Sequence, residues 1–277
     1  MKVFQSTTLG RTGLEVCPLG LASSYGVGGV DVERAYEYGV NFFYWGALRT
    51  PSFGEGFASL AAAHRSQLRL VIQTFTREPT RVRESLESAL RKLPRAGYAD
   101  VFTLGAWDEI PTPAIFDAAQ ECVAAGLART LMLSSHNRAI LPQLAATSAV
   151  DALMVRYNAA HSEADDDVFP NLGSRRPGVV GFTATHWGDL INPKYTPAGE
   201  KTPDAADCYR YAMTNPSIDV CVTGPKDAGQ LDQALQALDR GPMSHDELAW
   251  MRRVGAHVSV VGRQQAPAPD VLARGAV

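Results

Sequence analysis

"DVFTLGAWDEIPTPAIFDAAQECVAAGLARTLML", residues 100–133, contains the pattern that decides the class of fold. Its two ends, 100–104 and 129–133, are apolar runs that do not alternate with polar residues. Such runs are typical of strands buried on both faces. Between them, Thr112 is a helix cap, a proline takes the first helical position, and Gly126 ends the helix. The stretch therefore predicts one strand–helix–strand unit.

The same alternation continues in both directions along the chain. The expected strands are Val16–Leu21, Gly39–Tyr44, Leu70–Phe75, Asp100–Leu104, Arg129–Leu133, Ala152–Tyr157, Val179–Thr183 and Val220–Thr223. The clearest helices are expected at 31–39, 80–93, 112–126, 227–238 and 244–258. Strand and helix alternating eight times favour a single (β/α)8 TIM barrel over a doubly wound sheet.

The two ends of the chain differ from this pattern. "FQSTTLGRTGLEV", residues 4–16, predicts a small N-terminal β-hairpin that turns at Gly10–Gly13 and closes the bottom of the barrel. No linker or repeat interrupts the remainder, so we expect one domain over residues 1–262. Residues 263–277 are rich in Pro and Ala, and we expect a loose tail there.

Composition narrows the classes of partner. The chain has 277 residues, 45% of them apolar, and a net charge of −3, which does not favour nucleic acid or an anionic membrane as partner. No segment has the composition of a signal peptide or a membrane span. The four cysteines are scattered and no metal-ligand spacing occurs, so we expect reduced thiols, no metal and a cytoplasmic protein. Among the classes of partner, the composition therefore favours a small-molecule substrate. The sequence carries no signal for an oligomeric state.

In a barrel of this class, functional residues lie at the C-terminal ends of the strands. The second strand ends in "NFFYWGALR", residues 41–49, which offers Tyr44 and Arg49. A phenol has a pKa of about 10 and needs a nearby cation to donate a proton at neutral pH, and Arg49 is the candidate. Arg49 can instead anchor a carboxylate or phosphate. His136 follows the fifth strand and is a candidate general acid or base.

Each of these three residues also has a structural interpretation. Tyr44 can simply fill space in the mouth, Arg49 can be a solvated loop residue, and His136 can be a helix-cap histidine bonded to backbone.

Five segments of the chain resemble the aldo-keto reductases. They are "LGRTGLEVCPLGL" (9–21), "GVNFF" (39–43), "RYNAAHSEADDDVFP" (156–170), "GVVGFTATHWGDLINPKY" (178–195) and "TGPKDAGQLDQAL" (223–235). Their order and spacing extend the resemblance over residues 8 to 257. The resemblance implies a (β/α)8 barrel, an NADP(H) cofactor bound across its mouth, and hydride transfer to or from a carbonyl.

The catalytic residues of that family are not found at their positions. The resemblance implies an Asp, a Tyr, a Lys and a His at the strand ends. The residues standing there are Tyr44, Arg49, Phe75 and Gly105. We therefore expect an atypical active site, with Tyr44, Arg49 and His136 as the candidate catalytic residues.

The cofactor-binding positions are partly retained. At the nicotinamide end the resemblance implies contacts from Ser134, Ser135 and Phe182, whereas Met154 replaces a Gln. For the pyrophosphate and the adenosine 2′-phosphate it implies Thr183, Thr185, Gly188, Gly224, Lys226, Gln230 and Gln233. A lysine beside the free N–H groups of a helix start suits a phosphate.

Three functions remain open at this point. The first is a divergent NADP(H)-dependent oxidoreductase acting on a carbonyl or related small molecule. The second is a non-redox lyase, dehydratase or isomerase on the same barrel, which the altered nicotinamide end favours. The third is a catalytically silent NADP(H)-binding protein, which the loss of all four family residues favours.

Overall fold

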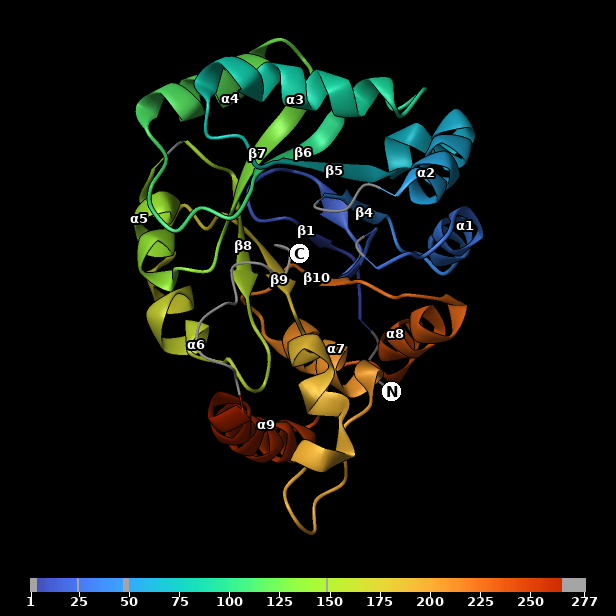
Figure 1. Cartoon of the computed structure of the whole chain (residues 1–277), viewed down its shortest axis with the longest axis vertical. Coiled ribbons are helices and arrows are strands. Elements are labelled where there is room, and N and C mark those ends of the chain that lie inside the picture. The colour runs from blue at the N-terminus through green and yellow to red at the C-terminus, as the bar shows by residue number, and fades with distance from the viewer. Residues whose placement is uncertain (1–3, 24, 47–49, 148, 266–277) are drawn as a thin grey trace.

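The computed structural model describes residues 4–23, 25–46, 50–147 and 149–265. Eight parallel strands close into a barrel in the order β10-β3-β4-β5-β6-β7-β8-β9, with helices around it (Figure 1). The strands are β3 (Leu19–Ala22), β4 (Phe42–Trp45), β5 (Arg69–Thr74), β6 (Ala99–Leu104), β7 (Ala128–Ser135), β8 (Ala152–Arg156), β9 (Gly178–Phe182) and β10 (Val220–Thr223). The predicted (β/α)8 barrel is thereby confirmed.

The helices occupy the connections between the strands. The α-helices are α1 (Gly29–Glu37), α2 (Pro51–His64), α3 (Pro79–Arg91), α4 (Pro113–Ala124), α5 (Leu141–Ala146), α6 (Ala164–Asp167), α7 (Ala205–Thr214), α8 (Ala228–Arg240) and α9 (His245–Gln265). The short 3-10 helices are η1 (Arg65–Gln67), η2 (Arg138–Ile140), η3 (Phe169–Asn171), η4 (His186–Ile191) and η5 (Pro193–Tyr195). Helix α3 begins at Pro79 rather than at the predicted Thr80, because the fixed φ of proline suits the first helical position.

The predicted N-terminal hairpin is present and lies at the N-terminal end of the barrel. β1 (Thr7–Thr8) pairs antiparallel with β2 (Glu15–Val16). Leu9, between them, is fully buried, and the amide of Gly10 donates to Asp219 just before β10. The predicted first strand, Val16–Leu21, is divided, because Val16 belongs to this hairpin and the barrel strand starts only at Leu19.

Two apolar cores follow from the alternation of side chains along the strands. The barrel interior is filled by residues from every strand and from the hairpin, including Leu9, Phe42, Val101, Met132, Met154 and Val220. The second core lies between the barrel and the helices. Because the interior is packed, a ligand can bind only outside it, and the mouth where the strands end is the expected place.

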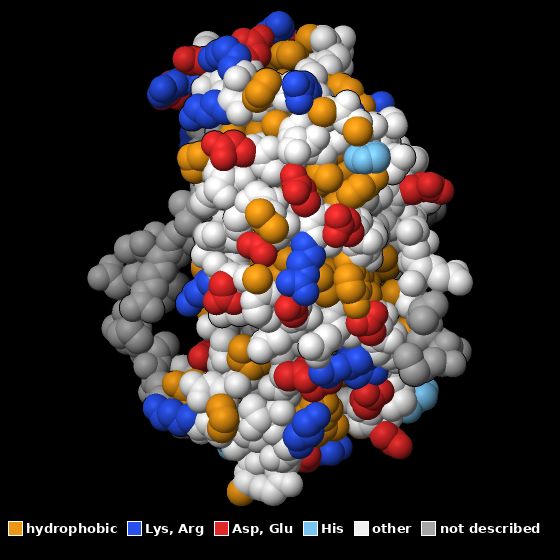
Figure 2. Space-filling view, turned by 90° about the vertical axis from the view of Figure 1, so that its right-hand side faces the viewer, with side chains coloured by type: hydrophobic (Ala, Val, Ile, Leu, Met, Phe, Trp, Pro, Cys, Tyr) orange, Lys and Arg blue, Asp and Glu red, His pale blue; other side chains and the backbone are white. Residues whose placement is uncertain are grey.

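The side of the barrel that carries α1, α2 and α8 has a mixed surface. Acidic and basic side chains are interspersed there with small apolar areas (Figure 2). Arg34 of α1 and Asp232 of α8 form an ion pair of 2.6 Å across this side. The surface therefore presents no single-sign field on this side.

Within the described ranges, no helix is both long and apolar enough to span a membrane. All four cysteines are free thiols and buried, and the cytoplasmic location stays a prediction. Residues 266–277 of the expected tail lie outside the described residues.

Candidate functional site

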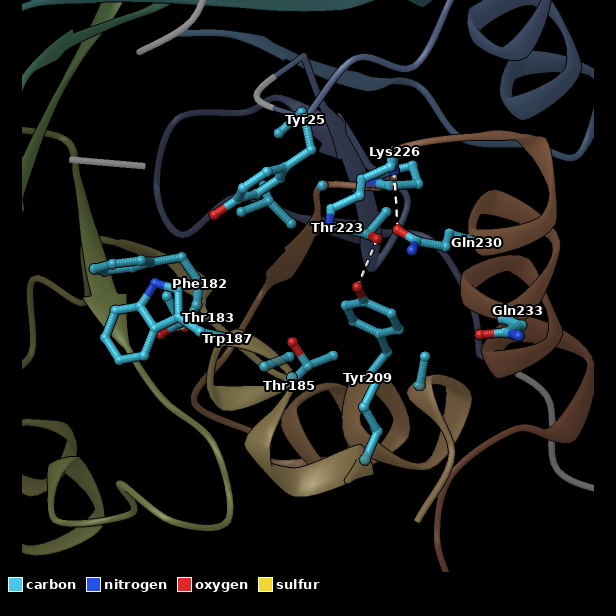
Figure 3. Close-up of a pocket in the computed structure, with 18 of the residues that line it drawn as sticks. Tyr25, Phe182, Thr183, Thr185, Trp187, Tyr209, Thr223, Lys226, Gln230 and Gln233 are labelled. Carbon is cyan, nitrogen blue, oxygen red and sulfur yellow. Dashed lines mark hydrogen bonds between the residues drawn. The ribbon is translucent and has the colours of Figure 1, made fainter. Parts of the chain in front are cut away.

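A pocket of about 410 Å³ opens at the mouth of the barrel (Figure 3). Its walls come from the ends of β9, β10, β3 and β4 and from helices α7 and α8. The volume falls within the roughly 300–1,000 Å³ typical of small-molecule sites. In a TIM barrel this end of the strands is the usual place of the active site.

The pocket brings together eight of the ten residues that the resemblance implied for the cofactor. They are Phe182, Thr183, Thr185, Gly188, Gly224, Lys226, Gln230 and Gln233. Tyr44 and Met154, both from the barrel interior, also line it. Residues separated by some 190 positions in the chain thus share one cavity, because the barrel closes β10 against β3.

The connection after β9 has an unusual backbone. Thr183, His186 and Trp187 have positive φ angles of 59°, 52° and 54°. Such angles are unfavourable for residues other than glycine and concentrate at functional sites. The side chain of buried Asn158 donates to the carbonyl of Thr183 at 2.8 Å and helps to hold this conformation. The loop is therefore fixed by its surroundings, with Thr183, Thr185 and Gly188 facing the pocket.

The residues that follow β10 form a second wall of the pocket, and this wall is polar. Gly224 lies against the ring of Tyr25, so that a Cβ at this position would be 2.7 Å from Tyr25 Cδ2. The amide of Lys226 donates to Gln230 Oε1 at 3.0 Å, at the start of α8. Lys226 is exposed, and in the described part of the chain no carboxylate pairs with it. A cation beside a helix N-terminus is a favourable place for a phosphate.

Tyr209 of α7 contributes a buried phenol to the same pocket. Thr223 Oγ1 donates to Tyr209 Oη at 2.7 Å (Figure 3). Burial raises the pKa of Tyr209, so the phenol keeps its proton. Sequence reasoning missed this residue, because Tyr209 lies within a helix that is buried on nearly every face and has the pattern of core.

The two predicted catalytic residues of the second strand have different outcomes. Tyr44 is buried in the mouth and its ring lies over the backbone of Gly46. Arg49 lies outside the described residues, so its proximity to Tyr44 stays a prediction.

Ser134, Ser135 and His136 do not line the pocket. Ser135 Oγ instead accepts the amide of Asn137 at 2.8 Å and donates to its carbonyl at 3.1 Å. His136 packs edge-on against Phe182, with ring centroids 5.4 Å apart, and its Nδ1 is 3.2 Å from Arg156 Nη2. Burial, and then the charge of Arg156, lower the pKa of His136. His136 therefore stays neutral at pH 7. It lies behind Phe182, which forms the pocket wall.

The positions where the resemblance implies Lys and His carry no ionisable side chain, and at the second of them there is no room for one. Phe75, at the end of β5, is 40% exposed. At Gly105 an added Cβ would lie 1.8 Å from Gln73 Nε2, so the side chain of Gln73 occupies this space. Arg77 donates to the carbonyl of Gly105 at 3.1 Å and stacks on Trp107 at 3.9 Å.

Comparison with solved structures identifies the class of fold. Aldo-keto reductase AKR11C1 from Bacillus halodurans, in its holo form, matches 91% of this chain and 96% of its own with a TM-score of 0.77. Its apo form matches the same shares with a TM-score of 0.75. The sequence identity is 16% in both cases. At this identity the likeness is one of fold: the chain is a (β/α)8 barrel similar in architecture to this aldo-keto reductase. No family model and no curated protein matches it.

Proposed function

We propose that this chain is an NADP(H)-dependent oxidoreductase that transfers hydride to or from a carbonyl compound through an atypical active site. The observation that carries the proposal is the shared pocket. Eight residues expected around the cofactor, from β9, its strained loop, β10 and α8, line one cavity of suitable size. If these eight residues had only a structural role, they would not need to line the same cavity.

The residues fit a dinucleotide phosphate. Lys226, exposed just before α8, suits the 2′-phosphate, although the carboxylate of Asp227 already accepts the amide of Gln230 at this helix start. Gly224 leaves space that a larger residue would fill, since a Cβ there would meet Tyr25. Phe182 offers a flat apolar face to the nicotinamide end. When bound, NADPH supplies the hydride.

Tyr44 is the candidate that gives a proton to the carbonyl oxygen. It lines the pocket from β4, two strands away from β10 in the barrel. His136, neutral at pH 7, is separated from the pocket by Phe182 and is better placed to support the substrate than to transfer its proton. Phe75 and Gly105 supply neither acid nor base. The alternative of an NADP(H)-binding protein without turnover is therefore retained.

The first experiment is a titration of the purified protein with NADPH, followed by nicotinamide fluorescence, with NADH for comparison. We expect micromolar binding that favours NADPH. Lys226→Met should weaken NADPH binding about tenfold or more and reduce the preference over NADH, because a charge-assisted phosphate contact is lost. Lys92→Met, an exposed lysine at the end of α3, is the matched control and should bind normally.

Three outcomes separate the functions. No NADPH binding up to millimolar concentration would overturn the oxidoreductase. Binding without reduction of any carbonyl in a substrate screen would favour the silent NADP(H)-binding protein. Turnover that persists after complete removal of the nucleotide would favour the non-redox enzyme.

A further inference from the structure

Arg156, the last residue of β8, is directed into the mouth of the barrel. Side chains alternate along a strand. Ala152 and Met154 belong to the barrel interior, whereas Leu153 and Val155 pack toward the helices. Arg156 therefore shares the inward face and lies one layer above Met154, which lines the pocket.

The surroundings of Arg156 form part of the pocket wall. In the register of the barrel it pairs with Phe182 of β9, and its guanidinium carbon is 5.4 Å from the ring centre of Trp187. Phe182 and Trp187 both line the pocket. On the other side, Arg156 Nη2 is 3.2 Å from His136 Nδ1. The guanidinium thus lies beside the cavity with Trp187 and His136 as neighbours, on a strand paired with that of Phe182.

Arg156 is partly buried and has no counterion of its own among the described residues. Glu163, the acid that acts on it from a distance, is paired with Arg138 at 3.8 Å and with His161 at 3.7 Å. Withdrawing an unpaired charge from water is costly unless a partner of opposite sign is supplied. An anion that enters from the pocket would supply this partner.

His136 holds the guanidinium at this place. An arginine has only N–H donors, so His136 Nδ1 must accept, and the ring proton is on Nε2. Burial and the charge of Arg156 favour this neutral form, since both lower the pKa of His136. With one Nη oriented by His136, the remaining guanidinium N–H groups offer a fork that suits the two oxygens of a carboxylate.

We propose that Arg156, supported by His136, binds the carboxylate of the substrate, and that the substrate is an aromatic 2-oxo acid or the matching 2-hydroxy acid. The aromatic preference comes from Trp187, which is 54% exposed, and from Tyr25, which is 43% exposed. The reaction assignment rests on the proposed function. In reduction, the hydride of NADPH adds to the carbonyl carbon and a proton adds to its oxygen, giving the 2-hydroxy acid and NADP⁺.

The first test uses a ligand that cannot react. Benzoate and the neutral benzamide are titrated by calorimetry, without nucleotide, into the wild-type protein and into Arg156→Met, Arg156→Lys and Arg252→Met. We expect benzoate to bind at least about tenfold more tightly than benzamide. Arg156→Met should abolish this preference and Arg156→Lys should keep part of it. Arg252→Met removes the same charge from an exposed arginine of α9 and should retain the preference.

The second test uses turnover. Phenylglyoxylate and its methyl ester are compared as substrates with NADPH, and the ratio of their kcat/KM values is measured. Arg156→Met should lower the ratio of acid to ester at least about tenfold, mainly through KM, because the lost contact is a binding contact. Arg252→Met should leave the ratio near its wild-type value.

The outcomes distinguish this site from the oxidoreductase proposal. Equal binding of benzoate and benzamide, or a preference that survives in Arg156→Met, overturns the carboxylate site even if NADPH is bound. A benzoate preference that depends on Arg156 in a protein that binds no NADPH sustains the site and removes the oxidoreductase. If Arg156→Met weakens NADPH as strongly as benzoate, Arg156 serves the nucleotide phosphate and the proposal is overturned.

Discussion

At the scale of single residues, the unusual feature of this mouth is a group of imidazoles held around a cation. The rings of His161 and His186 are 4.9 Å apart. Burial, then the charge of Arg156 and then His186, lower the pKa of His161 to about 4. Burial also lowers the pKa of His186, against the opposing effect of Asp189. The folded protein therefore keeps these imidazoles neutral in a pH range where an exposed histidine takes up a proton.

This neutral state makes stability depend on pH. In the unfolded chain His161 takes up a proton near its ordinary pKa of 6.5, whereas in the folded chain it does so only near pH 4. The unfolded state therefore binds more protons between these values, and the free energy of unfolding falls as pH drops from about 6.5 to about 4. His161→Gln should flatten this slope, by at most about 1.4 kcal/mol per pH unit.

The measurement is urea denaturation at a series of pH values. His257→Gln, an exposed histidine of α9, is the control and should keep the wild-type slope. Glu163 and Arg138 also face His161 and are unchanged in both variants. A slope that His161→Gln leaves untouched would mean that His161 is protonated in the folded protein.

At the scale of elements, Asp219 joins three segments at the N-terminal end of the barrel. It is buried immediately before β10 and accepts the amides of Gly10 at 3.1 Å and of Val179 at 2.9 Å. Its other oxygen is 2.8 Å from Arg176 Nη2. One carboxylate thus attaches the N-terminal hairpin to β9, which explains how so short a hairpin stays in place.

Removing this carboxylate should weaken the attachment of the N-terminal hairpin to the barrel. We expect Asp219→Ala to lower the free energy of unfolding by about 2–4 kcal/mol, because two buried amides and an arginine lose their acceptor. Amide hydrogen exchange of Gly10 should become faster. Asp166→Ala, which changes an exposed aspartate of α6, should alter stability by less than about 0.5 kcal/mol. Equal effects in the two variants would contradict the role of Asp219.

Elements with a clear hydrophobic period could be predicted from the sequence, and others could not. All eight strands were expected because buried parallel strands are continuous apolar runs. Helix α2 lacks a comparable signal because it contains Gly54 and Gly56, and a Cβ at Gly56 would lie 2.6 Å from Gly29 Cα of α1. Close packing of two helices requires that glycine, and a single sequence does not show which neighbour it meets.

The residues of the functional site also divide into those that the sequence could place and those that it could not. Residues within motifs, such as Phe182 and Lys226, could be placed in advance, because the motif fixes their position on a strand end. Tyr209 could not, because its neighbours make it resemble core. Arg156 lay in a quoted motif, but its lack of a counterion depends on residues that meet only in three dimensions.

At the scale of the whole molecule, the C-terminal helix is connected to the functional end of the barrel. Helix α9 packs beside α7, η4 and η5 and on the connection that follows β8, at one end of the molecule (Figure 1). Arg210 of α7 binds Glu247 in the first turn of α9 with two contacts of 2.6 and 3.1 Å. The hydrogen bond from Arg210 lowers the pKa of Glu247 to about 2. The helix is thereby fixed against the loops that carry His161 and Trp187.

Substitutions at two glycines of α9 test whether this helix holds the residues at the mouth of the barrel in position. A Cβ at Gly255 would lie 2.0 Å from the carbonyl oxygen of Ala159, in the connection between Arg156 and His161. Alanine there forces backbone apart, so we expect Gly255→Ala to lower the free energy of unfolding by about 1–3 kcal/mol. It should also weaken benzoate binding, because the displaced segment begins at Arg156.

Gly262→Ala is the matched change in the same helix. The nearest atoms to its added Cβ are His186 Cε1 at 3.9 Å and Asp189 Oδ2 at 4.0 Å, which is ordinary contact. Because alanine favours a helix over glycine by about 1 kcal/mol, this variant should be equally or more stable than the wild type. Thermal denaturation and benzoate titration of both variants decide the question. If Gly255→Ala is as stable as Gly262→Ala and binds benzoate normally, α9 does not hold the mouth in position, and Arg156 must be fixed by the barrel strands alone.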